Sequence, residues 1–124
     1  MTAKQPKLVS AAEAAALVRS GDWVDYGLLQ PERFDRALAA RARELTGVKV
    51  RCCLTLRPPA FVEADPGGER FQLYSWHFSA IDRKLHDAGR THYIPMNFGE
   101  APDYYRRFIE PADVVVEGLI LRAR

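Results

Sequence analysis

Residues 23–54 read WVDYGLLQPERFDRALAARARELTGVKVRCCL, and this stretch decides the fold class. It opens with a short strand pattern, 23–26, that Gly27 closes. Pro31 suits the first turn of a helix, where the N–H that proline lacks would have no partner. The helix pattern carries an apolar stripe and stops at Gly47; the stripe is Phe34, Leu38, Ala42 and Leu45. Apolar and polar residues then alternate over 48–54, so the stretch predicts a strand–helix–strand unit.

The alternation of helix and strand continues on both sides of this unit. Ser10 and Glu13 have the spacing of a capping box, in which serine caps the helix and glutamate reaches back to it. Later patterns predict strands at 71–78, 91–96 and 114–116, and helices at 82–88 and 102–108. Strands separated by helices indicate an α/β fold, with a largely parallel sheet and flanking helices. The sequence contains no repeat and no linker, so we expect a single domain over 1–124.

Composition and charge exclude several classes of partner. Eighteen Lys and Arg residues against 16 Asp and Glu give a net charge of +2, and acids interrupt the arginines of 31–44. A nucleic-acid site gathers basic residues on one face, so we expect no nucleic-acid partner. No apolar run reaches the roughly 18 residues of a membrane span, and 1–9 has no apolar signal segment. We therefore expect no membrane partner.

The cysteines and histidines match no recognised metal or catalytic motif. Cys52 and Cys53 are adjacent, so on a strand they point to opposite faces and a bond between them would be strained. Reduced thiols in a cytoplasmic protein are the simplest interpretation. His77, His86 and His92 lie nine and six residues apart, which is no known ligand spacing, so we expect no metal. The glycines match neither a P-loop nor a dinucleotide fingerprint.

Three features invite a functional interpretation, and each has a plainer alternative. Gly27 and Gln30 belong to a strand-to-helix turn, the place where α/β sheets bind ligands, although such a turn is often an ordinary connection. His77 could act in acid–base chemistry or simply pack on a half-buried strand. Glu117 follows three valines, so its carboxylate is either desolvated and reactive or placed at a strand end facing solvent.

The strongest functional indication is an ordered set of short motifs that spans nearly the whole chain. They are SGDWVDYG at 20–27, DRALAAR at 35–41, VKVR at 48–51, SWH at 75–77, YIP at 93–95, EAPDYYRR at 100–107 and PADV at 111–114. In this order and spacing they resemble the opening of the acetyl-CoA hydrolase/transferase family. The likeness is greatest to the butyryl- or propionyl-CoA:acetate CoA-transferases. The resemblance implies the first part of the N-terminal half of a class I-like CoA-transferase.

The resemblance also implies a mechanism that needs no metal or prosthetic group, with coenzyme A as a substrate. In the family, a glutamate carboxylate attacks an acyl-CoA thioester and forms a mixed anhydride. The released CoA thiolate attacks the glutamyl carbonyl, and the resulting enzyme–CoA thioester passes CoA to a second carboxylic acid. The expected partners are therefore an acyl-CoA and a short-chain carboxylate. The resemblance makes Gly27, Gln30 and His77 substrate-side candidates.

The sequence departs from the family in length and at its end. The catalytic glutamate and the glycine-rich CoA-binding segments belong to the family's second half, and no residue here, Glu117 included, matches that nucleophile. We therefore expect a fragment that is inactive alone. The alternatives are a binding subunit that pairs with a separate C-terminal chain, or a non-functional remnant. The acyl group stays open.

Two structural expectations follow from this interpretation. Gln30 should lie at the C-terminal end of a strand, on the open side of the sheet and next to a helix N-terminus. The apolar run 114–121 should be an edge strand that lacks its neighbour, because the elements that would flank it are missing. Such an edge predicts self-association of the chain, or pairing with the missing half.

Overall fold

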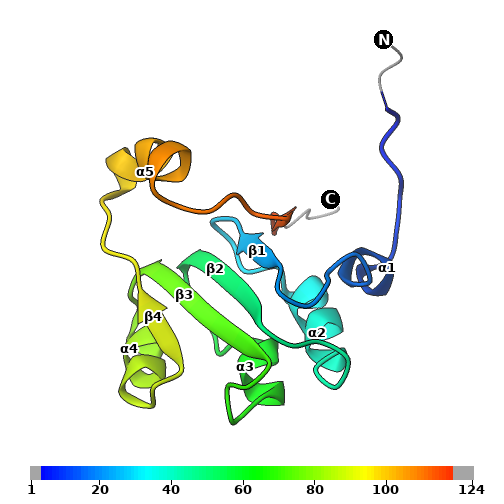
Figure 1. The fold of residues 1–124 in the computed structure, drawn as a ribbon, viewed down its shortest axis with the longest axis horizontal. Helices are drawn as coiled ribbons and strands as arrows, with labels where there is room; N and C mark the ends of the chain where they lie inside the picture. Colours follow the sequence, from blue (N-terminus) through cyan, green and yellow to red (C-terminus); the bar gives the residue numbers. More distant parts are fainter. Residues whose placement is uncertain (1–3, 119–124) are drawn as a thin grey trace, which may run out of the picture.

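The computed structural model describes residues 4–118 (Figure 1). Five strands lie within that range: β1 (Trp23–Tyr26), β2 (Val48–Leu54), β3 (Phe71–His77), β4 (Thr91–Tyr93) and β5 (Val114–Val116). The helices are α1 (Ala11–Ala15), α2 (Glu32–Ala40), α3 (Ala60–Ala64), α4 (Ala80–Asp87) and α5 (Ala101–Arg107), and a 3₁₀ turn, η1 (Phe98–Glu100), precedes α5. The alternation of helix and strand predicted from the sequence is confirmed.

The five strands form one parallel sheet in the order β4-β3-β2-β1-β5. This confirms the α/β class and the parallel sheet with flanking helices. Strands β1 to β4 follow one another across the sheet in chain order, and β5 then returns to the free side of β1. The direction of winding therefore reverses between β1 and β5. In open α/β sheets, the crevice beyond the C-terminal strand ends at such a reversal is the usual ligand site.

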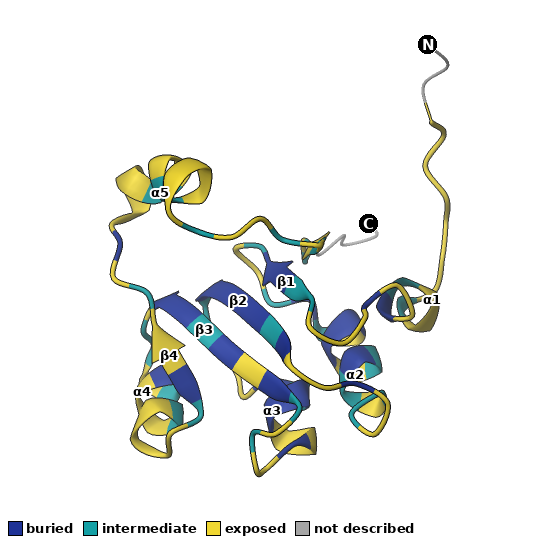
Figure 2. Ribbon diagram, viewed as in Figure 1, coloured by how far each residue is buried: buried dark blue, intermediate teal, exposed yellow. Residues whose placement is uncertain are grey.

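One face of the sheet holds the apolar core, which α1 to α4 cover (Figure 2). Phe34 and Leu38, two residues of the predicted helical stripe, are buried from α2 against the sheet. Burying one such side chain contributes about 1.5–3 kcal/mol, so this face supplies most of the driving force for folding. The strand residues of the core are Val24, Tyr26, Val48, Val50, Cys52, Phe71 and Leu73.

The opposite face is polar and aromatic, and α5 with the segment after it covers part of it. Arg51 of β2 is 1% exposed and forms two 2.8 Å hydrogen bonds to the carboxylate of Asp25 on β1. Its guanidinium stacks on the rings of Trp23 and Tyr105, at 5.0 and 4.8 Å from their centroids, and donates to the Glu110 carbonyl at 3.0 Å. Burial raises the pKa of the Asp25 carboxyl, while Arg51 acts to lower it. Through the Tyr105 ring and the Glu110 carbonyl, Arg51 thus ties α5 and the segment after it to the sheet.

Three elements differ from the sequence prediction. Helix α2 ends at Ala40 rather than at the predicted stop, Gly47, and residues 41–44 form turns. The sequence patterns predict no helix between residues 54 and 71, but Pro58 and Pro59 lead into α3, a short helix that buries Phe61 and Val62. Strand β4 ends at Tyr93 rather than at residue 96, because the chain leaves the sheet there. Met96 instead joins a second apolar cluster, with Cys53 and Trp76, on the α5 side of the sheet.

Candidate functional site

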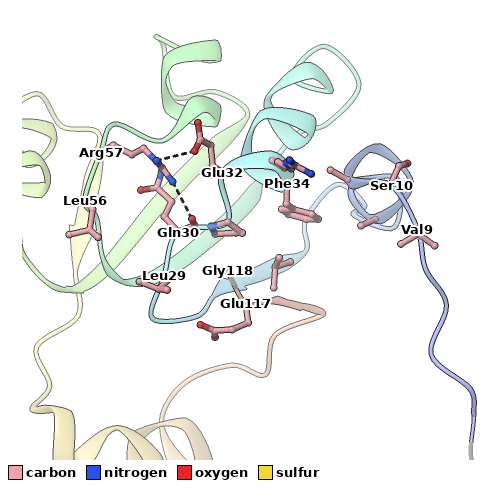
Figure 3. A pocket seen from close by; sticks show the side chains of 15 residues that line it. Val9, Ser10, Leu29, Gln30, Glu32, Phe34, Leu56, Arg57, Glu117 and Gly118 are labelled. Carbon is pink, nitrogen blue, oxygen red and sulfur yellow. Dashed lines mark hydrogen bonds and ion pairs between the residues drawn. The ribbon is translucent and has the colours of Figure 1, made fainter. Parts of the chain in front are cut away.

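A cavity of about 830 Å³ opens at the reversal point of the sheet (Figure 3). Its walls come from four segments: 9–14 around the start of α1, 29–34 between β1 and α2, 56–57 after β2, and 116–118 at the end of β5. Three of these segments follow strand C-terminal ends, so the cavity lies where the topology predicts a ligand site. Its volume is within the usual range for small-molecule pockets, about 300–1,000 Å³.

Gln30 is held in this wall by a buried carboxylate. Its Nε2 donates to Oδ2 of Asp35 at 3.4 Å, and Asp35 is 3% exposed at the start of α2. The same carboxylate accepts the Tyr26 hydroxyl at 3.1 Å and the Ala60 backbone N–H at 2.8 Å. Burial, and then the charge of Asp35, raise the pKa of the Tyr26 hydroxyl well above its usual range. Asp35 therefore joins β1, α2 and the start of α3 behind the cavity and orients the Gln30 side chain.

The other end of the Gln30 carboxamide has no partner. Its Oε1 is buried, and no hydrogen-bond donor reaches it among the residues that the structure describes. Amide oxygen and nitrogen are told apart here by their partners, since only the nitrogen can donate to the Asp35 carboxylate. The cavity wall thus contains a buried acceptor without a donor, an uncommon feature in folded proteins.

Arg57 forms the charged rim of the cavity. Its Nη1 lies 3.0 Å from Oε2 of Glu32, and its Nη2 donates to the Gln30 main-chain oxygen at 3.5 Å (Figure 3). The Arg57 side chain is 50% exposed, so this ion pair is worth at most about 1 kcal/mol. The pair can open at small cost, which leaves a guanidinium able to meet an anionic ligand.

Gly27 lies behind the cavity and accommodates Glu117, which lines it. The Gly27 N–H donates to the Val116 carbonyl at 2.9 Å, the last bond between β1 and the β5 segment. A Cβ on Gly27 would lie 1.5 Å from Oε2 of Glu117, so a side chain there would force this carboxylate to move away. Glu117 is exposed at a strand end, which is the plainer of the two alternatives considered for it.

His77 lies apart from the cavity. It ends β3 and is paired with Leu54 of β2, so β2 separates it from β1, and it does not line the cavity. The three substrate-side candidates therefore share the C-terminal edge of the sheet, but only Gln30 lines the cavity, with Gly27 directly behind it. Gln30 lies at the end of β1 beside the N-terminus of α2, as expected.

Sequence reasoning missed Asp35 and Arg57. Asp35 belongs to one of the resembling motifs, and the acids among the arginines of 31–44 were used only to argue against a nucleic-acid partner. The one available signal was its spacing from Phe34 and Leu38, since residue 35 borders the apolar stripe of the same helix. Arg57 lies outside every motif that the sequence analysis identified.

Neither the thiols nor the other titratable groups form a further reactive centre within residues 4–118. Burial raises the pKa of the Cys52 thiol to about 12, and that of Cys53 is raised as well, so both stay protonated and unreactive near neutral pH. Within the same residues, no three His, Cys, Asp or Glu side chains gather as a metal site would require. No helix in this range is long and apolar enough to cross a membrane.

The fold defines a parallel α/β protein with a cavity at the reversal point of its sheet, and comparisons with known proteins identify its relatives. The butyryl-CoA:acetate CoA-transferase of Anaerostipes caccae is 36% identical over 114 residues, 90% of this chain and 26% of the relative. The probable butyrate:acetyl-CoA coenzyme A-transferase of Syntrophomonas wolfei is 43% identical over 112 residues, 89% of the chain and 25% of the relative. This chain is therefore homologous to the butyryl-CoA:acetate CoA-transferases, as its motifs predicted.

Two further comparisons agree with this assignment, and one search found nothing. The succinyl-CoA:cyclohexane-1-carboxylate CoA transferase of Geobacter metallireducens is 34% identical over 110 residues, 87% of the chain and 24% of the relative. A solved structure of a RipA mutant superposes with a TM-score of 0.65 at 23% identity, over 82% of this chain and 26% of that one, which supports the fold. No protein-family model matches the chain. The chain thus spans about a quarter of the length of the curated relatives it matches.

Proposed function

We propose that this chain is the N-terminal, substrate-facing unit of an acyl-CoA:acetate CoA-transferase that works on butyryl- or propionyl-CoA in the cytoplasm. The observation that carries the proposal is the cavity at the reversal point of the sheet, in a chain whose relatives are named for this reaction. Coenzyme A is a substrate here, and the reaction uses no metal or prosthetic group.

The chemistry divides between this unit and residues outside the chain. A glutamate supplied by the remainder of the transferase attacks the thioester carbonyl, and the C–S bond breaks to give a mixed anhydride and CoA thiolate. The thiolate attacks the glutamyl carbonyl, which releases butyrate and leaves an enzyme–CoA thioester. Acetate then takes over the CoA by the reverse of these two steps. This unit binds the acyl-CoA beside Gln30, with the Arg57 rim toward anionic groups.

The experiment measures acetyl-CoA formed from butyryl-CoA and acetate. The chain alone should give none, because it contains no matching nucleophile. A fusion of this chain to the remaining three quarters of the Anaerostipes caccae transferase should restore CoA transfer, whereas that remainder without this chain should not.

Two results would contradict the proposal. Turnover by the chain alone would return Glu117 or His77 to consideration as catalytic groups. A folded fusion with no transfer would favour the non-functional remnant. If transfer also occurs when the two polypeptides are mixed unfused, the alternative is favoured in which this chain is a binding subunit of a separate C-terminal chain.

A further inference from the structure

The two faces of the parallel sheet are covered unequally. Helices α1 to α4 close the face that holds the apolar core. Among the described residues, α5 is the single α-helix on the other face, and it packs near the C-terminal strand ends, beside Cys53 and Trp76 (Figure 1). Parallel sheets of α/β proteins are covered on both faces, because their crossover helices pack there. The α5 face therefore has only part of the cover that this class of sheet requires.

The open part of the α5 face carries a strip of rings with polar groups beside it. Trp23 of β1, Tyr74 of β3 and His92 of β4 follow one another across the sheet, with ring centroids 5.0 and 4.7 Å apart. The first two are half-buried and the third is exposed. Lys49 of β2 places Nζ 5.3 Å from the Trp23 ring centroid, and Gln72, its partner on β3, is exposed. Aromatic side chains with polar tips are enriched where one protein surface packs on another.

The strand order indicates what covers this face. Crossovers between parallel strands are right-handed, so the direction of winding sets the face on which the connecting helix lies. Winding from β1 to β4 puts α2 to α4 on the core face, and the reverse step from β4 to β5 puts α5 on the opposite face. A helix that leads from β5 to a strand on its free side winds in the direction of that reverse step. Chain that extends the sheet past β5 therefore lies on the α5 face as well.

We propose that the α5 face of the sheet is the docking surface for the remaining three quarters of the transferase, with Gln72 and Val115 beneath the contact. The proposal rests on the function proposed above, since it takes the partner from relatives of which this chain spans about a quarter. Val115 of β5 is 69% exposed and is paired with Asp25 of β1, so it lies on the α5 face. The partner surface is mainly apolar, because it packs on this valine and on the strip of rings.

The test measures how fast single cysteines react with a maleimide, in the chain alone and in its fusion to the remaining three quarters of the Anaerostipes caccae transferase. Gln72→Cys reports on the middle of the face, since β3 is paired on both sides, and Val115→Cys reports on the β5 edge. Arg36→Cys is the matched control, because the Arg36 side chain is 73% exposed on α2, on the core side of the sheet. The native Cys52 and Cys53 are buried, so slow labelling of both shows that a sample is folded.

The expected result is that fusion slows the labelling of Gln72→Cys and Val115→Cys by about 10-fold or more, because a covered thiol reacts only when the docked part opens. Arg36→Cys should label at the same rate in both proteins. Mass spectrometry of the digested proteins gives the rate at each site.

Four outcomes would overturn the docking surface. The first is an equal rate at Gln72→Cys in the chain and in a folded fusion. The second is slowing at Val115→Cys alone, which would mean that the remainder pairs with the β5 edge and leaves the face open. The third is equal slowing at Arg36→Cys, which would show that the protection is not specific to this face. The fourth is slowing of Gln72→Cys in the chain alone as its concentration rises, which would make a second copy of the chain the occupant.

The transfer activity of the same fusion is a separate measurement. Transfer together with an unprotected Gln72→Cys would refute the docking surface and leave the proposed function standing. Protection at both sites without transfer would support the docking surface and contradict the proposed function.

Discussion

Single residues on the α5 side of the sheet contribute to stability far more than their charge suggests. Arg51 is 1% exposed and is the only cation hydrogen-bonded to Asp25 among the described residues. Arg51→Met would leave the Asp25 carboxylate buried without its partner and free the Glu110 carbonyl. We expect the free energy of unfolding, measured with urea, to fall by about 3–5 kcal/mol.

A matched control for Arg51 is available on α2. Arg36 forms an exposed i,i+4 pair with Glu32 at 2.6 Å, and its side chain is 73% exposed. Arg36→Met should cost no more than about 1 kcal/mol. Equal effects of the two substitutions would mean that the pair between Arg51 and Asp25 is solvated, contrary to its burial in the structure.

The buried Cys52 thiol should make the folded chain less stable at alkaline pH. Burial raises its pKa from 9.0 to about 12, so the folded chain holds this proton more tightly than the unfolded chain does. This difference in proton binding stabilises the folded chain fully below pH 9. As the pH rises toward 12, the free energy of unfolding falls by up to about 4 kcal/mol. Urea unfolding at several pH values between 8 and 11 should show a shallower decline in Cys52→Ala than in the wild type. Parallel declines would contradict the assignment to this thiol.

At the scale of elements, the cavity depends on how closely the β1–α2 loop approaches the chain after β5. A Cβ on Gly118 would meet the Leu29 carbonyl oxygen at 2.7 Å, a backbone atom that cannot move without displacing the loop. A Cβ on Gly27 would meet only the end of the Glu117 side chain, which can swing away. We expect Gly118→Ala to lower the free energy of unfolding by about 1–3 kcal/mol, and Gly27→Ala by less than about 1 kcal/mol.

The double variant Gly27→Ala with Glu117→Ala is the control for this comparison. Removing the Glu117 carboxylate should restore most of the free energy of unfolding that Gly27→Ala loses, because it removes the clash. Urea unfolding curves of Gly27→Ala and of the double variant test this expectation. If the double variant is no better than Gly27→Ala, the loop backbone rather than Glu117 resists the methyl group.

At the scale of the whole molecule, β5 remains the expected surface for association. Among the described residues β5 pairs only with β1, so it is an edge of the sheet, and Val115 is 69% exposed on it. The predicted run 114–121 extends beyond the described residues after 118. Unpaired edges with apolar residues recruit other chains. We expect the intact chain to self-associate in sedimentation velocity experiments as its concentration rises.

Two comparisons locate the association. A version ending at Asp113, and the variant Val115→Lys, should both sediment as monomers, because a lysine on an edge strand opposes pairing. Tyr93→Lys on β4, the opposite edge, should leave the association unchanged. A strictly monomeric intact chain would show that β5 needs no further partner.

The sequence by itself determined the elements, because the signals for them are local. The strand patterns predicted β1, β2 and β5 at their observed bounds, and the capping box of Ser10 and Glu13 forms at α1 as predicted. These patterns depend on side chains a few residues apart, so the sequence alone is enough to predict them. The short helix α3 was missed, since five residues after two prolines carry too little periodicity.

Only the tertiary structure decided which of the candidates meet. The placement of β5 beside β1 creates the reversal point and brings Glu117 against Gly27, although these residues are 90 positions apart in the chain. The same strand order leaves His77 two strands away from β1, and α5 buries Arg51 on a face that alternation predicted to be polar. Strand order and helix docking arise from contacts distant in sequence, which local periodicity does not encode.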